Sequence, residues 1–167
     1  EVKYGTSSKA SEFGDLPYLR MNNITYSGHM DLGSLKFIDL SDDVPYHKYG
    51  TRRGDILFNR TNSRELVGKT GLVRSDEKMI LAGYLIRVRL SKGVVPEYVW
   101  SWMNSQWVKT HLRNLCRGIV GQANINAQEL KSIPIPIAPF ELQSEFKDKL
   151  TEIESQKDQA LMQLREG

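Results

Sequence analysis

The sequence predicts an α+β protein: a mixed, twisted, β-rich domain that also carries helices, followed by a long C-terminal helix of the coiled-coil type. Three observations lead to this class. Short aliphatic and aromatic runs separated by Gly, Asp, Asn and Ser fill residues 1–90, helical spacing starts near residue 95, and heptad-like spacing follows residue 140. With 167 residues, 40% of them apolar, the chain is large enough to bury one core.

The strands are expected in the first 90 residues, between clusters of turn-forming residues. The run at 84–90 alternates best, because its apolar residues share one face while Arg87 and Arg89 share the other. We therefore expect a half-buried strand with both arginines on the exposed side. The expected strands cover residues 16–24, 36–40, 55–59, 71–74 and 84–90.

A helix is expected over residues 95–116. Pro96 and Glu97 suit its first turn, and apolar residues then recur at helical spacing. The expected apolar face consists of Val99, Met103, Trp107, Val108, Leu112 and Leu115.

Residues 117–126 form a glycine- and amide-rich segment that predicts a loop. At its end, Asn126 and Glu129 have the spacing of a capping box, which predicts a short helix. The alternating prolines of residues 133–139 exclude a helix there and predict an edge strand or an extended connector.

The last helix is expected from Phe140 to about Arg165, a rod of about 39 Å at the usual rise per residue. Its apolar or small residues recur at steps of four and three, which are heptad steps, with one lysine interrupting. Such a helix either pairs with another helix or packs back on its own domain, and the sequence leaves both open. The helix-pairing candidates are Phe146, Leu150, Ile153, Lys157, Ala160 and Leu164.

The net charge of the chain changes sign near the start of this last helix. The first 137 residues carry 19 basic and 13 acidic residues, a net charge of +6, whereas residues 138–167 carry a net charge of −3. A basic body with a mildly acidic tail favours a polyanion as the partner of the body, although an ordinary solvated surface gives the same count.

Several functional classes find no support in the sequence. A single cysteine excludes an internal disulfide, and the three histidines lack ligand spacing, so we expect no metal site. The segment 76–78, Asp-Glu-Lys, resembles a nuclease triplet but is more often a charged turn. We therefore expect no catalytic residue in this chain. With no signal peptide or 18-residue apolar stretch, we expect a cytoplasmic protein without membrane contact.

Polar clusters at the ends of the expected strands are candidates for DNA binding. Six consecutive polar residues, 59–64, follow one strand; Arg reaches guanine with two hydrogen bonds, Asn pairs with adenine, and Ser or Thr binds phosphate. The alternative is a turn held by its own backbone hydrogen bonds. The candidate residues are Arg20, Asn22, Asn23, Lys48, Arg52, Arg53, Asn59, Arg60, Thr61, Asn62, Ser63, Arg64, Lys69, Gln122 and Asn124.

Seven motifs, each weak alone, follow one another along nearly the whole chain. They lie at residues 4–10, 19–24, 54–63, 66–70, 82–87, 121–126 and 133–141. In this order they resemble the specificity subunit of type I restriction–modification enzymes. In that family, two recognition domains each read one half of a split DNA site, and each is followed by a long helix. The two helices pack antiparallel and set the spacing between the half-sites.

The resemblance implies that residues 1–137 are a target-recognition domain for double-stranded DNA and that residues 138–167 are one spacer helix. That helix would pair with a second half-subunit or a second copy of the chain. The modification subunit would dock on the assembly and bring S-adenosylmethionine to methylate adenine; the restriction subunit would bring ATP and Mg²⁺. This chain itself would hold no cofactor. Base-choosing residues are expected in the less recognisable segments 46–53 and 75–79.

Three alternatives remain at this point. The runner-up within the same class is the recognition domain of a single-chain restriction–modification enzyme. A helical dimerisation adaptor with an incidentally basic body would form dimers but show no salt-sensitive affinity for DNA. A nuclease would cut DNA with magnesium and this chain alone.

Overall fold

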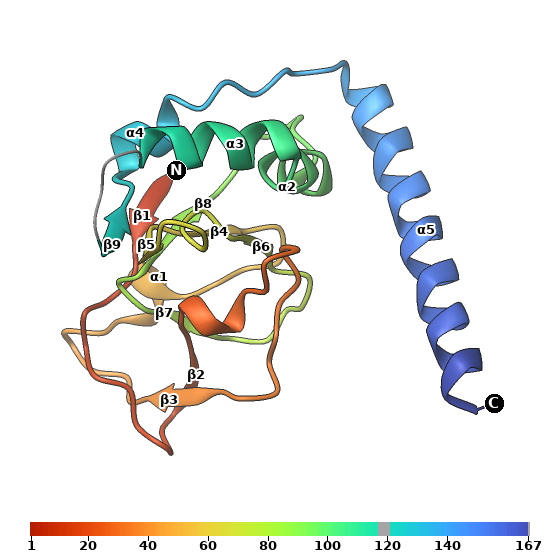
Figure 1. The fold of residues 1–167 in the computed structure, drawn as a ribbon. Coiled ribbons are helices and arrows are strands. Elements are labelled where there is room, and N and C mark those ends of the chain that lie inside the picture. The colour runs from red at the N-terminus through yellow and green to blue at the C-terminus, as the bar shows by residue number, and fades with distance from the viewer. Residues whose placement is uncertain (117–120, 167) are drawn as a thin grey trace.

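The computed structural model describes residues 1–116 and 121–166 and shows a β-rich body with one long helix beside it (Figure 1). The expected α+β class is confirmed. Three small sheets build the body. A four-stranded antiparallel sheet has the order β1-β8-β4-β6, formed by Val2–Tyr4, Leu85–Val88, Ile56–Asn59 and Thr70–Leu72.

A second sheet has the order β3-β2-β7, in which β2 pairs antiparallel with β3 and parallel with β7. These strands are β3 (Lys36–Ile38), β2 (Leu16–Leu19) and β7 (Ile80–Leu81). The third sheet joins β5 (Thr61–Ser63) to β9 (Gln122–Asn124), so it ties the middle of the chain to a segment about sixty residues later.

Two cores lie on opposite faces of the four-stranded sheet. Ile56 and Phe58 of β4 point into a cluster with residues of α2 (Pro96–Met103) and α3 (Gln106–Leu115). Leu57, between them, joins Leu19 and Leu81 in a second cluster beneath the other face. Because β4 is covered on both faces, all four of its residues are buried, which explains the apolar run from Ile56 to Phe58.

The expected strand at 84–90 forms as β8, but the expected exposure of its arginines is wrong. Arg87 is 1% exposed, because the Gly50 segment covers this face of the sheet and accepts a hydrogen bond from its guanidinium. Burial lowers the pKa of Arg87, an effect opposed by the nearby carboxylates of Asp55 and Glu1. Arg89 is partly buried and bonds the Asp55 carboxylate at 2.8 Å. Both arginines therefore serve the fold.

Two expected elements differ most from the prediction. The strand expected at 16–24 ends at Leu19, because Arg20 and Asn23 close a 3-10 turn, η1 (Met21–Asn23). The helix expected at 95–116 is two helices, since Ser105 caps α3 by accepting a hydrogen bond from the Val108 N–H. Trp107 and Leu115, both assigned to the apolar face, are about half exposed, and α3 buries Val108 and Leu112 instead.

The later elements follow the prediction closely. Asn126 and Glu129 form the expected capping box at the start of α4 (Ala127–Lys131). Of the loop expected at 117–126, residues 117–120 lie outside the described residues. Residues 133–139 form an extended connector over α2, with Trp102 and Tyr98 donating side-chain hydrogen bonds to the Pro134 and Pro136 carbonyls. A one-turn helix, α1 (Tyr46–Tyr49), completes the body.

The long helix α5 (Phe140–Glu166) is confirmed. It leaves the top of the body and runs down one side of it (Figure 1). None of the helices in residues 1–116 and 121–166 is long and apolar enough to cross a membrane.

Candidate nucleic-acid interface

A groove of about 630 Å³ opens on the body where four distant segments meet. It is lined by the N-terminal loop, residues 6–10, by Arg20 at the end of β2, by Arg60 and Thr61, and by residues 82–84. Four of the motifs found in the sequence therefore converge on one surface, although they are spread over about eighty residues of chain.

The N-terminal side of this groove is rigid. A side chain on Gly5 would place its Cβ 2.2 Å from the Ala82 carbonyl oxygen, so the two backbones approach as closely as glycine allows. The buried Tyr18 hydroxyl donates to the carbonyl oxygens of Thr6 and Ser8 at 2.8 and 2.9 Å. Burial raises the pKa of Tyr18 to about 12, which keeps this donor protonated.

Two arginines line the groove, Arg20 directly after β2 and Arg60 between β4 and β5. The backbone of Arg20 is held by the η1 turn, in which its N–H donates to the Asn23 side chain at 2.9 Å. The backbone of Arg60 is held on both sides, because its N–H donates to the Tyr84 carbonyl and its carbonyl accepts from the Ile125 N–H. The Nε atoms of Arg20 and Arg60 are buried and have no hydrogen-bond partner among the described residues.

Aromatic rings flank these cations. The guanidinium of Arg60 lies 4.9 Å from the centre of the Tyr4 ring, and Tyr84, which lines the groove, is half exposed. Lys9 and Ser7 are exposed on the loop that lines the groove. Arginine forks, aromatic faces, a hydroxyl and an ammonium in one groove are the groups that bind bases and phosphates.

Comparison with known proteins decides the family. A sequence profile described as "Type I restriction modification DNA specificity domain" matches residues 3–164. The chain belongs to this family. It is 31% identical over 150 residues to the specificity subunit of the type I restriction enzyme EcoKI from Escherichia coli K12, covering 87% of this chain and 32% of that protein. The EcoBI specificity subunit of E. coli is 26% identical over 145 residues, covering 86% of this chain and 30% of that protein.

Solved structures show the same fold. The HsdS subunit from Thermoanaerobacter tengcongensis superposes with a TM-score of 0.61 at 16% identity, covering 93% of this chain and 35% of that one. A chain from a study of complex assembly and conformational transition of the type I R-M system gives 0.68 at 17% identity, covering 93% of this chain and 36% of that one. This specificity domain spans about a third of the length of the relatives it matches.

Three of the predicted DNA-binding residues are buried and serve the fold of the specificity domain. The Asn23 amide donates to the Asp31 carbonyl at 2.9 Å, and the fully buried Asn59 amide donates to the Leu66 carbonyl at 3.4 Å. The Lys69 ammonium donates to the Met21 carbonyl at 2.7 Å, and burial lowers its pKa. We leave these three out of the interface, because each is buried and donates to a backbone carbonyl inside the body.

The structure brings two of the predicted clusters together. Residues 61–63 form β5 and pair with β9, so that Thr61 lies opposite Asn124 and Ser63 opposite Gln122. The Thr61 hydroxyl bonds the Asn124 amide oxygen at 2.9 Å. Exposed candidates that extend this surface beyond the groove are Asn22, Asn62 (in part), Arg64, Gln122 and Asn124.

The fourth predicted cluster, Lys48, Arg52 and Arg53, does not line the groove. Arg53 is bound to Asp76 at 3.1 Å, and Lys48 lies over the Tyr49 ring. Asp76, which pairs with Arg53, is the first residue of the nuclease-like triplet at 76–78. Across the described part of the chain, no group of three or more His, Cys, Asp or Glu side chains is placed to hold a metal ion.

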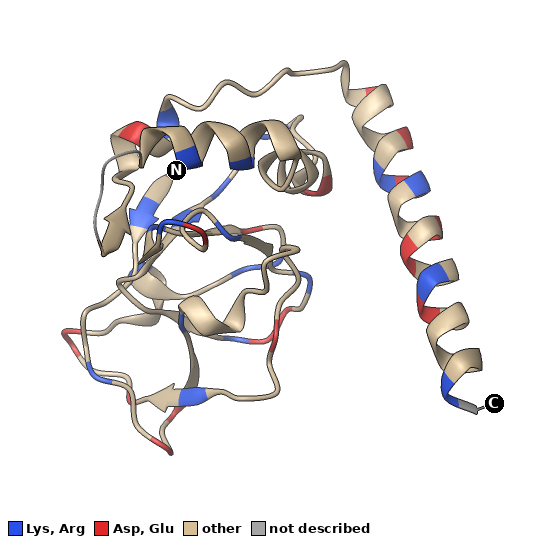
Figure 2. Ribbon diagram, in the orientation of Figure 1, with Lys and Arg blue, Asp and Glu red and all other residues tan. Residues whose placement is uncertain are grey.

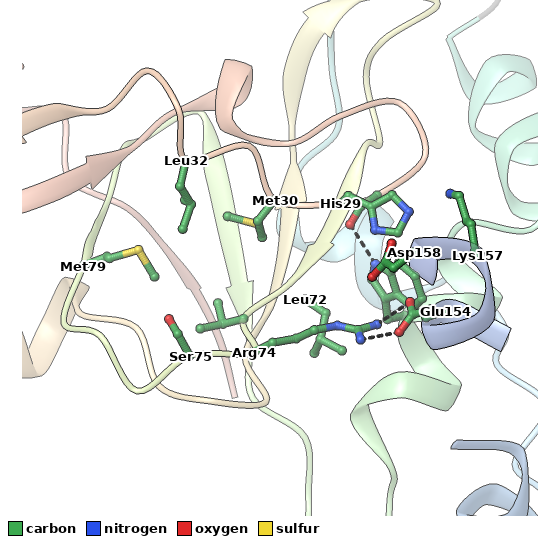
Figure 3. Close-up of a pocket in the computed structure, with 13 residues that line it drawn as sticks. His29, Met30, Leu32, Leu72, Arg74, Ser75, Met79, Glu154, Lys157 and Asp158 are labelled. Atoms are coloured by element: carbon green, nitrogen blue, oxygen red, sulfur yellow. Dashed lines mark hydrogen bonds and ion pairs between the residues drawn. The ribbon is translucent and has the colours of Figure 1, made fainter. Parts of the chain in front are cut away.

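The junction between the body and α5 is built from specific contacts. The buried Gln143 side chain accepts from the Val95 N–H at 2.9 Å and donates to the Ala138 carbonyl at 2.7 Å. Further along, Arg74 of the body binds Glu154 of the helix through two hydrogen bonds of 2.5 and 2.9 Å (Figure 3). The Arg74 guanidinium also lies 5.1 Å from the centre of the Trp100 ring.

A cavity of about 350 Å³ lies at this junction, between the Arg74–Glu154 pair and the apolar side chains of the body (Figure 3). Two of the residues predicted to pair α5 with another helix lie at this junction instead. Leu150 packs against the core of the body, and Lys157 lines this cavity. The other predicted pairing residues, Phe146, Ile153, Ala160 and Leu164, are exposed.

Sequence reasoning missed Lys9 and Tyr84 as groove residues and Tyr4 as the ring against Arg60, although all three lie inside motifs that it recognised. Their position in motifs 4–10 and 82–87 was the signal that pointed to them. It was overlooked because a single tyrosine or lysine next to a strand is common in any domain.

Proposed function

We propose that residues 1–137 are a target-recognition domain that reads one half of a split site in double-stranded DNA. The observation that supports this most directly is the groove, where Arg20 and Arg60 lie among Tyr4, Tyr84 and Lys9. The body around it carries a net charge of +6. A basic, rigid groove with bidentate donors provides both the affinity for phosphates and the means to distinguish bases.

Each group in the groove has a distinct proposed role. Arg60 and Arg20 read base edges, since the guanidinium fork matches the two acceptors of guanine. This assignment replaces the expected base readers in segments 46–53 and 75–79, because neither segment lines the groove. Ser7 and Lys9 bind the phosphate backbone on the rigid side of the groove, where the position of the loop is fixed by Tyr18. Fixed phosphate contacts set the register in which the arginines meet the bases.

We propose that α5, within residues 138–167, is a spacer that pairs with a second spacer helix. The second helix comes from a second copy of this chain or from the second half of a longer subunit. Support comes from two apolar side chains of α5 that the body leaves uncovered, Ile153 and Leu164, which are 62% and 79% exposed. Covering such side chains is favourable, and the length of the rod is comparable to one turn of B-DNA.

The domain itself supplies no catalytic residue and no cofactor in this proposal. A modification subunit docks on it and methylates adenine with S-adenosylmethionine, and a restriction subunit brings ATP and Mg²⁺ to the assembly. The complex acts in the cytoplasm, where its DNA substrate lies. Support comes from the family match and from a solved neighbour that belongs to a type I complex.

Co-purification with a modification subunit, followed by mapping of methylated adenines, tests this function. We expect methylation within one split sequence. Adenines methylated at unrelated sequences, or magnesium-dependent cutting of DNA by this chain alone, would contradict the proposal.

The role of Arg60 is tested in the same complex with two substitutions. Arg60→Lys keeps the charge but loses the planar fork, so we expect an unchanged salt dependence and relaxed choice at one base pair. Arg60→Ala loses both the charge and the planar fork, so the free energy of binding should weaken by about 1–3 kcal/mol. If both variants methylate the wild-type sequence with wild-type selectivity, Arg60 does not read a base.

A further inference from the structure

A second basic site lies outside the groove, on helix α3. Lys109 and Arg113 are four residues apart, so they share one face of the helix. The lysine and arginine positions of the ribbon, those of α3 included, are blue in Figure 2. We propose that Lys109 and Arg113, positioned by Tyr26, bind a backbone phosphate of the same DNA duplex that the groove reads, without regard to sequence. This inference rests on the proposed function.

Tyr26 holds both cations in place. The Lys109 ammonium donates to the Tyr26 carbonyl at 2.7 Å and lies 4.1 Å from the centre of its ring. The Arg113 guanidinium donates to the Tyr26 hydroxyl. An ammonium has three donors and a guanidinium has five, so these contacts leave most N–H groups of both side chains for another acceptor.

The charge balance at this site favours an anion. Like charges four residues apart on a helix repel each other, yet the fold brings them to the same tyrosine. Lys69 lines the same small pocket, and among its described lining residues Glu65 is the one acid. Burial lowers the pKa of Lys109, and the neighbouring Arg113 lowers it further. A bound anion would relieve this repulsion.

The site also lies close enough to the groove for one duplex to reach both. Thr61 lines the groove and Glu65 lines the α3 pocket, and four Cα–Cα steps of 3.8 Å separate them by at most about 15 Å. Lys69 gives a second link, since it lines the pocket and binds the backbone next to Arg20. This distance is less than one turn of B-DNA, about 34–36 Å.

A phosphate at the rim of this pocket suits the site better than a base edge, because the pocket itself, about 10 Å³, is too small to admit either. The pocket is small, and its donors come from a lysine and an arginine held at one ring. A compact ammonium recognises charge and not a donor–acceptor pattern. The site should therefore add affinity for any duplex and leave the choice of sequence to the groove.

The test uses the specificity domain in complex with its modification subunit and compares two double variants. The first combines Lys109→Ala with Arg113→Ala, and the control combines Lys92→Ala with Lys131→Ala. Lys92 and Lys131 are exposed on the body, so the control removes the same charge elsewhere. Binding is measured over a range of salt on the methylated duplex, on a scrambled duplex and with inorganic phosphate as competitor. Thermal unfolding of each variant, and the charge-conserving pair Lys109→Arg with Arg113→Lys, control for damage to the fold.

We expect the log–log salt slope to become shallower by about 0.9 for the α3 variant, the value for one phosphate contact, and by less for the control. The loss of affinity should be the same on both duplexes, and the charge-conserving pair should retain binding. An unchanged slope, or a loss confined to the methylated duplex, would overturn the inference while the groove function stands. If the wild-type complex itself binds both duplexes equally and without salt dependence, the proposed function fails instead.

Discussion

The body and α5 use apolar residues in opposite ways. In the body, successive residues of β4 enter two different cores and are all buried. In α5, apolar side chains such as Ile153 and Leu164 remain mostly exposed, and the helix touches the body along one side only. The body therefore contains its own source of stability, whereas the helix depends on a few junction contacts and on a partner. Charge follows the same division, +6 against −3.

The largest expected effect concerns the partner of the helix. Ile153→Glu combined with Leu164→Glu should abolish pairing of the chain, because burying each such side chain contributes roughly 1.5–3 kcal/mol. Leu150 is unsuitable for this test, since it packs on the body. We expect the wild-type chain to sediment as a dimer at micromolar concentration and the double variant to sediment as a monomer.

The matched control for pairing is Ser155→Glu with Gln159→Glu, two exposed positions of the same helix that carry no apolar side chain. This variant should sediment as the wild type does. A wild-type chain that is strictly monomeric would show that the helix does not pair with a second copy of itself.

The next effect contrasts the two regions within one chain. Phe58→Ala removes a buried ring from the larger core and should lower the free energy of unfolding by about 3–5 kcal/mol. Ile153→Ala removes an exposed side chain and should change it by less than about 0.5 kcal/mol at concentrations where the chain is monomeric. Denaturant unfolding measures both values, and equal losses would show that the helix is part of the core.

A smaller effect is expected at the junction. Gln143→Ala leaves the Val95 N–H and the Ala138 carbonyl without their side-chain partners, which should cost about 1–3 kcal/mol. Gln156→Ala on the exposed part of the helix is the control and should be nearly neutral. If both substitutions have the same effect in denaturant unfolding, the helix is not anchored through Gln143.

The smallest effect is a pH dependence confined to the body. The pKa of Tyr18 is about 12 in the fold against an ordinary value of 10, so the unfolded chain releases this proton first. The free energy of unfolding should therefore fall as pH rises from about 10 toward 12, and be independent of Tyr18 below pH 10. Tyr18→Phe should remove this fall. An ordinary titration of Tyr18, followed by phenolate absorbance, would contradict the burial argument.

Local patterns in the sequence predicted most single elements. The steps of four and three predicted α5, and the Asn126–Glu129 spacing predicted the start of α4. Ser105 shows what such patterns miss, because a lone serine within an apolar period is also the cap that divides α2 from α3. An N-cap signal was present in the sequence but was outweighed by the apolar periodicity around it.

Long-range contacts were beyond sequence reasoning. The alternation of residues 84–90 predicted a strand but assumed solvent on its polar face, where the structure has the Gly50 segment over Arg87. The pairing of β5 with β9 joins residues about sixty positions apart, and no local pattern announces it. For the same reason Asn59, which is buried, and Asn62, which is partly exposed, looked alike in the sequence.

The central claim is that the body, and not α5, binds and reads DNA. It is tested most directly by removing the same amount of positive charge from each. The body variant combines Arg20→Ala with Arg60→Ala, and the helix variant combines Lys147→Ala with Lys149→Ala. Duplex binding of both is measured over a range of salt in the complex with the modification subunit. Our account predicts that the body variant loses sequence preference and binds the wild-type site more weakly, because both arginines read base edges. It also predicts that the helix variant keeps the wild-type preference and slope. A helix variant that loses as much binding as the body variant would contradict the account.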